Sequence, residues 1–128
     1  MKINLPASIG ELFDKITILE IKRSKIKDKI KLKIINQELN LLKKVVLTKK
    51  INTRNLTSLI KQLKNINVRL WNVEDKLRIF EKNQSFKKDF ISYARKVYHM
   101  NDKRAYLKNE INKKTNSLIS EVKSYEKY

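Results

Sequence analysis

The sequence contains very few of the residues that disulfides, metal sites and tight turns require. Its 128 residues include no cysteine, one glycine, one proline and one histidine. Without cysteine, a disulfide framework and a cysteine-based zinc site are excluded, and a single histidine argues against a histidine-based metal site. β-Hairpins, barrels and glycine-rich phosphate loops need several glycines at positive φ. We therefore expect a nearly all-helical protein without a metal or a cofactor.

Long hydrophobic runs are also missing. No uninterrupted apolar stretch approaches the roughly 20 residues that span a bilayer, and residues 1–10 lack the long apolar region of a secretory signal. The length fits one domain, residues 1–128. These absences favour a soluble, cytoplasmic, single-domain protein with no transmembrane segment.

Basic residues greatly outnumber acidic ones. There are 31 lysines and arginines against 13 acidic residues, which gives a formal net charge of +18. Such a charge favours an acidic protein, a nucleic acid or another polyanion as partner. Only six of the basic residues are arginines, however, although the planar guanidinium suits phosphates and base edges better. Two interpretations stay open: an anion-binding surface without sequence specificity, or a composition set by an A/T-rich genome.

Apolar residues at helical spacing predict four helices after an extended N-terminal arm, residues 1–7. The arm is extended because Pro6 disfavours a helical conformation in the residue before it. Ser8 and Glu11 form a capping box for the first helix, and Asp28 caps the second. The third helix has apolar residues at heptad spacing, and Ser85 is expected to cap the last one. The predicted helices cover about 9–27, 29–47, 56–82 and 86–123, the last continuous or broken near His99–Asp102.

Short connections favour antiparallel neighbours, so the expected fold is an all-α, up-down antiparallel bundle of four helices, or five if the last is broken. At 1.5 Å per residue the third helix spans about 40 Å and a continuous last helix over about 50 Å, against about 30 Å for the first. A hairpin of the two long helices would therefore project beyond the others. Because its apolar stripe would need a second chain to cover it, we also predict a homodimer.

Several charged residues occupy positions that the 3.6-residue period places on the apolar faces. A lone buried charge costs several kcal/mol, so these residues must pair. One interpretation is an ion-pair network that fixes the helix register. The other is a cleft in which arginines and lysine bind an anionic group, with a glutamate as orienting group or general acid/base. The candidates for anion or partner binding are Arg23, Glu74, Arg78, Arg104 and Lys108, and the polar network also includes Asp14, Glu20, Asp75, Glu81, Asn101 and Asp102.

A basic run surrounds the turn between the first two helices. It consists of Lys22, Lys25, Lys27, Lys29, Lys31 and Lys33, with Arg23 among them. In an up-down bundle the turn between the last two helices, with Lys82, Lys87 and Lys88, lies at the same end. That end would attract polyanions through its potential alone.

Three segments carry a resemblance to a known family. They are Ser8–Lys22, Leu70–Asp75, which reads Leu-Trp-Asn-Val-Glu-Asp, and Tyr98–Asn112, with Asn-Asp-Lys-Arg-Ala at 101–105. In these segments the chain resembles a bacterial and phage family catalogued as domain of unknown function 6165. The resemblance implies a helical fold and no particular chemistry. We therefore predict a helical accessory or interaction module, with non-specific nucleic-acid binding and a small anion-handling enzyme as alternatives.

Overall fold

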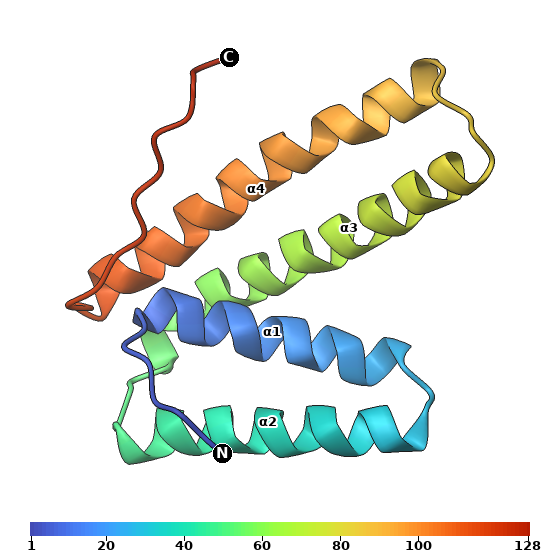
Figure 1. The fold of residues 1–128 in the computed structure, drawn as a ribbon. Coiled ribbons are helices and arrows are strands. Elements are labelled where there is room, and N and C mark those ends of the chain that lie inside the picture. The colour runs from blue at the N-terminus through green and yellow to red at the C-terminus, as the bar shows by residue number, and fades with distance from the viewer.

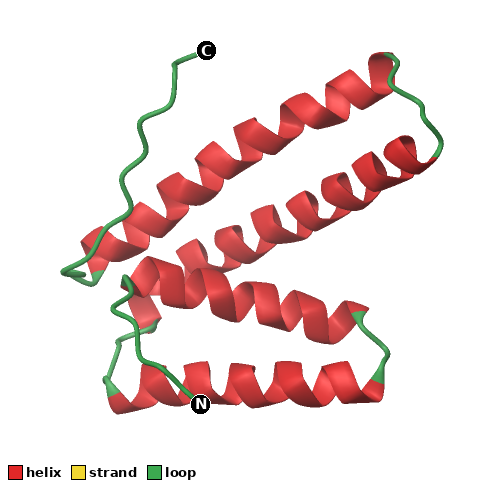
Figure 2. Ribbon diagram, viewed as in Figure 1, coloured by secondary structure: helices red, strands yellow, loops and turns green.

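The computed structural model describes all 128 residues and contains four α-helices, one short 3-10 helix and no strand (Figures 1 and 2). The predicted all-α bundle with a single long α3–α4 hairpin is confirmed. None of the helices combines the length and the apolar character that crossing a membrane requires. The elements are α1 (Ile9–Lys25), α2 (Lys29–Thr48), η1 (Arg54–Leu56), α3 (Thr57–Lys82) and α4 (Lys88–Lys114).

Two of the three predicted N-caps are present. The Ser8 hydroxyl accepts a hydrogen bond from the Glu11 amide at 3.0 Å, and the Asp28 carboxylate accepts one from the Lys31 amide at 2.9 Å. The prediction that Ser85 caps the last helix is wrong. Its amide instead donates to the Phe80 carbonyl at 2.9 Å, after Gln84 at φ 52°, and thereby closes the end of α3.

The last helix is a single element that ends earlier than predicted. α4 runs without interruption through His99–Asp102 and stops at Lys114, not near Lys123. Asn116 adopts φ 52°, and the Ser117 amide donates to the Asn112 carbonyl at 2.9 Å, the same closure that ends α3. The chain beyond is not helical, so Leu118 and Val122 are exposed and do not continue the apolar stripe of α4.

The four helices form two hairpins that diverge from each other (Figure 1). α1 packs against α2, α3 and α4, whereas α2 packs against α1 alone. The core lies where α1 meets the α3–α4 hairpin and includes the fully buried Leu63, Leu107 and Ile111. α1 therefore holds the fold together.

The α3–α4 hairpin projects beyond α1 and α2, as the helix lengths predicted. Its far end is closed internally, because Phe80 contacts Phe90 and Tyr93 with ring centroids 6.3 and 5.8 Å apart, and Phe86 contacts Phe90 at 5.2 Å. These contacts cover part of the stripe within one chain, since Phe80, Phe90 and Tyr93 are half-buried while Phe86 is 46% exposed. The argument for a homodimer at the hairpin is therefore weaker, and homodimerisation stays a prediction.

Candidate functional site

The start of α1 lies directly against α4 at the only glycine of the chain. The Gly10 amide donates to the Asn112 Oδ1 atom at 2.6 Å, and the Ile9 amide donates to the Ser117 hydroxyl at 3.2 Å. A Cβ atom at Gly10 would overlap the carbonyl oxygen of Lys108 and lie 2.9 Å from Asn112 Oδ1. Glycine is therefore required here for a close helix approach, which also supplies acceptors for the free amides of the first turn.

A buried carboxylate links the three central helices. Asp14 on α1 is 1% exposed and accepts hydrogen bonds from Arg104 Nε at 2.9 Å and Arg104 Nη2 at 2.5 Å. The Asn67 side-chain amide on α3 donates to Asp14 at 2.9 Å and to the Thr17 hydroxyl at 3.0 Å. The bidentate hydrogen bonds to Asp14 raise the pKa of the Arg104 guanidinium, against the opposing effect of burial. We call Asp14, Asn67 and Arg104 the Asp14 clamp.

Lys108 is a second buried cation, and carboxylates of its own chain surround it. Its Nζ atom lies 2.7 Å from Glu11 on α1 and 2.8 Å from Glu121 in the C-terminal tail, and its side chain is 8% exposed. Burial is the largest single effect and lowers the pKa of Lys108, but the carboxylates of Glu11, Glu121 and Asp14 together raise it more, so the net shift is upward. The sequence analysis missed Glu121, because it extended the last helix to about residue 123, whereas α4 ends at Lys114.

The Lys108–Glu121 contact predicts a pH-dependent docking of the tail. The ammonium group of Lys108, 2.8 Å away, lowers the pKa of Glu121 below its ordinary 4.5. The stabilisation of the docked tail by ionised Glu121 is therefore fully present above pH 4.5 and is lost as the pH falls through the lowered pKa. The stabilisation by charged Lys108, whose pKa is raised, is fully present below pH 10.5 and is lost only as the pH rises through the raised pKa.

We expect acid to release the tail and neutral pH to keep it docked. Amide chemical shifts of residues 117–122, followed from about pH 7 to about pH 2, should show one step below the ordinary glutamate pKa. The Glu121→Gln variant serves as the control and should lose this step. Identical titration curves in both proteins would contradict a docked Glu121.

Other predicted network residues lie apart from these two buried sites. Glu20 is near Lys64 (3.8 Å) and Lys43 (4.0 Å). Glu74 pairs with Arg78 on the surface of α3 at 3.1 Å, and Asp102 accepts a hydrogen bond from the Tyr128 hydroxyl.

The prediction that Arg23 and Glu81 face inward is wrong, since both are exposed and neither forms an ion pair. Arg23 lies near the end of α1, where this helix diverges from the α3–α4 hairpin, and Glu81 lies in the projecting part of α3 (Figure 1). Both side chains therefore face solvent.

The basic run lies at the turn between α1 and α2. Lys25, Lys27, Lys29, Lys31 and Lys33 are exposed, and Lys22 is half-buried. Figure 1 shows this turn and the α3–α4 turn on the same side of the molecule, but at the ends of diverging hairpins. The lysines of the two turns therefore do not form the single basic end that an up-down bundle would create.

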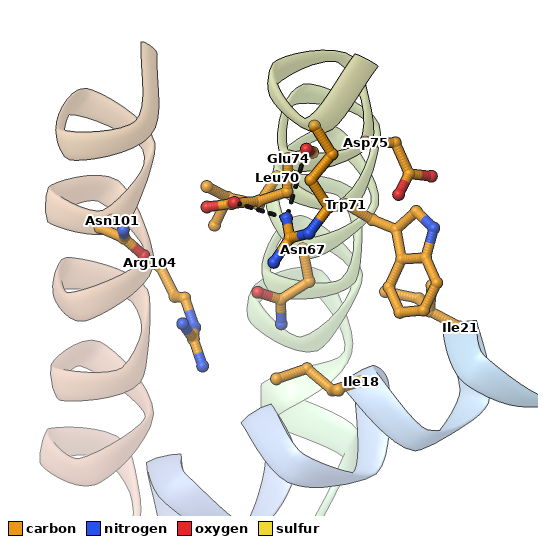
Figure 3. A pocket seen from close by; sticks show the side chains of 10 residues that line it. Ile18, Ile21, Asn67, Leu70, Trp71, Glu74, Asp75, Asn101 and Arg104 are labelled. Carbon is orange, nitrogen blue, oxygen red and sulfur yellow. Dashed lines mark hydrogen bonds and ion pairs between the residues drawn. The ribbon is translucent and has the colours of Figure 1, made fainter. Parts of the chain in front are cut away.

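A groove of about 430 Å³ opens beside the Asp14 clamp. In Figure 3, Trp71 and Asp75 project from the same side of α3 above Ile21 of α1, whereas Arg104 reaches in from α4. All three segments that carry the family resemblance contribute to it. We call it the Trp71 groove; its lining consists of Ile18, Ile21, Asn67, Leu70, Trp71, Glu74, Asp75, Arg78, Asn101 and Arg104.

Five of the predicted residues therefore meet at one place: Glu74, Asp75, Arg78, Asn101 and Arg104. Lys108 is not among the lining residues. Trp71 was not predicted as a site residue, because an aromatic beside a helical stripe more often fills a gap between helices. The available signal was its spacing to Asp75, since residues four apart share a helix face.

The comparison with protein families assigns the whole chain, and not the groove in particular, to a family of unknown function. The sequence model described as "Family of unknown function (DUF6165)" matches residues 1–128, so the chain belongs to this family. Neither a curated protein nor a solved structure shows a significant match to the chain.

Proposed function

We propose that this member of the DUF6165 family is a non-catalytic interaction module whose Trp71 groove binds a cationic side chain of a partner protein. The observation that carries the proposal is the pairing of Trp71 with Asp75, one helical turn apart, above an apolar wall from α1. A cation over an aromatic face gains electrostatic energy, and a neighbouring carboxylate adds a hydrogen-bond acceptor.

The charge balance inside the groove supports a cationic guest. Arg104 donates two hydrogen bonds to Asp14, from Nε and Nη2, and Arg78 donates one to Glu74 at 3.1 Å. Asp75 forms no ion pair within 4 Å. The two arginines are thus already occupied, and Asp75 is the carboxylate left to receive a positive group.

The same contacts speak against the enzyme alternative. An anion-handling site needs free cations that converge on the substrate. Arg104 and Lys108 instead contact Asp14, Glu11 and Glu121 of their own chain, and Lys108 does not line the groove. These contacts support an ion-pair network that holds the helices in place. Non-specific nucleic-acid binding and homodimerisation rest on the net charge and the helix lengths, and both stay separate predictions.

Because Trp71 is the only tryptophan, its fluorescence reports on the groove alone. We expect a short peptide with one arginine between leucines to change this emission and to bind at least about tenfold more tightly than the same peptide with glutamate in place of arginine. The Asp75→Asn substitution should lower the affinity for the arginine peptide by about tenfold.

The matched control is Asp89→Asn, which removes the same charge from an exposed position on α4. This variant should bind the arginine peptide like the unaltered protein. Equal affinity for both peptides, or equal effects of the two substitutions, would refute a cation-binding groove.

A further inference from the structure

α2 is the least covered helix of the molecule. It packs against α1 alone, and only Ile35 and Leu39 of its 20 residues are buried. In Figure 1 it forms the outer edge of the structure, away from α3 and α4. One side of α2 is therefore free for another molecule.

This free side is apolar. It displays Ile30, Ile34, Leu41 and Val45, which are 76%, 61%, 50% and 38% exposed. Their spacing of four, seven and four residues places them within about 60° of one another around the helix, and their centre lies about 130° from that of Ile35 and Leu39. We call these four residues the outer stripe. Gln37 lies between the two halves of this stripe. A surface helix normally presents charged or polar residues on its free side, so four exposed apolar residues there mark a candidate interaction site.

Lysines border the outer stripe. By the same helical period, Lys33 and Lys44 lie along one border and Lys31 along the other. All three are exposed and none forms an ion pair. The one acidic residue at a border, Glu38, is already paired with Lys15 of α1 at 3.0 Å. The surface therefore combines an apolar centre with positively charged edges.

We infer that the outer stripe of α2 docks an amphipathic helix of a partner protein whose apolar face is bordered by acidic residues. Helix pairing of this kind uses apolar contacts for affinity and border charges for partner choice. A second copy of this chain fits less well, since two α2 helices would bring their lysine borders against each other. The stripe spans 15 residue steps, or about 22 Å, so a partner helix of about four turns covers it.

This surface is separate from the Trp71 groove, because none of the groove's lining residues lies on α2. The partner helix on α2 and the cationic side chain in the groove are thus two independent contacts. An experiment on one leaves the other untouched.

The test uses the full chain and a synthetic amphipathic peptide of about 20 residues, with leucines at heptad positions and glutamates at the borders. We expect it to become helical on binding, as circular dichroism reports, and to bind at least about tenfold more tightly than a peptide with lysines at the borders. Its affinity should fall as the salt concentration rises from about 0.05 to about 0.5 M, because salt screens the border charges.

The double variant Ile34→Gln/Leu41→Gln should bind the peptide with glutamate borders at least about tenfold more weakly than the parent protein does. It should keep the helical content of the parent, since both side chains are exposed. Ile91→Gln is the matched control: it changes an apolar residue that is 56% exposed on α4, and it should bind like the parent.

Three outcomes would overturn the inference. The first is equal affinity for the two peptides, and the second is unchanged binding by the double variant. The third is a different occupant: a concentration-dependent dimer in light scattering, or binding to phosphatidylglycerol vesicles, that Ile34→Gln/Leu41→Gln abolishes while the acidic peptide does not bind. Trp71 emission with the arginine peptide checks the groove separately in the same samples.

Discussion

Replacing Asp14 with alanine is expected to lower the free energy of unfolding by about 3–5 kcal/mol. The substitution leaves the guanidinium of Arg104, whose side chain is 29% exposed, without its bidentate partner. It also removes an acceptor from the buried Asn67 amide. Most of the loss comes from these unpaired groups and not from the attraction itself, because an isolated pair gains little over well-packed apolar residues. Urea unfolding followed by circular dichroism measures the change.

The surface pair of Glu74 and Arg78 gives the matched control. These residues lie four apart on α3, with side chains 46% and 74% exposed. Glu74→Ala should therefore cost only about 0.3–0.5 kcal/mol. A double variant, Asp14→Leu/Arg104→Met, should recover part of the stability that Asp14→Ala loses, because it removes both charges together. Similar losses for Asp14→Ala and Glu74→Ala would show that the Asp14 clamp does not hold the helices.

The sequence was a good guide to what each helix does by itself. Apolar spacing predicted four helices, and the hydroxyl of Ser8 and the carboxylate of Asp28 correctly identified two helix starts. These features depend on neighbours within a few residues. Ser85 does not cap α4, because its amide instead donates to the Phe80 carbonyl at the end of α3. This hydrogen bond depends on the positive φ of Gln84. Glutamine has no preference for positive φ, so the sequence did not predict this conformation.

Partners between helices were predicted less well. The sequence analysis predicted that Asp14 and Arg104 belong to one polar network, but it did not predict their pairing. It also predicted, wrongly, that Arg23 faces inward. The helical period defines a face of one helix but not the angle at which two helices cross. Because the two hairpins diverge, the half of α1 that contains Asp14 meets α4, whereas the Arg23 side chain near the other end is exposed. The Glu121 contact depends on where α4 stops, which the apolar pattern misplaced.

At Gly10, helix propensity and tertiary packing predict opposite effects of an alanine substitution on stability. By helix propensity alone, Gly10→Ala should stabilise the protein by about 0.5–1 kcal/mol. The structure predicts the opposite sign, because the new methyl group would overlap the backbone carbonyl of Lys108. Backbone cannot move aside as the end of a side chain can, so α1 must shift away from α4. We expect a net loss of about 1–3 kcal/mol in the free energy of unfolding, and a larger loss for Gly10→Val.

A second substitution distinguishes the two obstacles at this site. Asn112→Ala removes the side-chain oxygen 2.9 Å from the added methyl but leaves the Lys108 carbonyl in place. It also deprives the Gly10 amide of its acceptor. Gly10→Ala/Asn112→Ala should therefore be no more stable than Gly10→Ala in urea unfolding. If Gly10→Ala raises the stability, or if the second substitution restores it, α1 and α4 do not meet backbone to backbone. The Asp14 clamp one turn further along α1 would then lose the close approach that brings Arg104 within reach of Asp14.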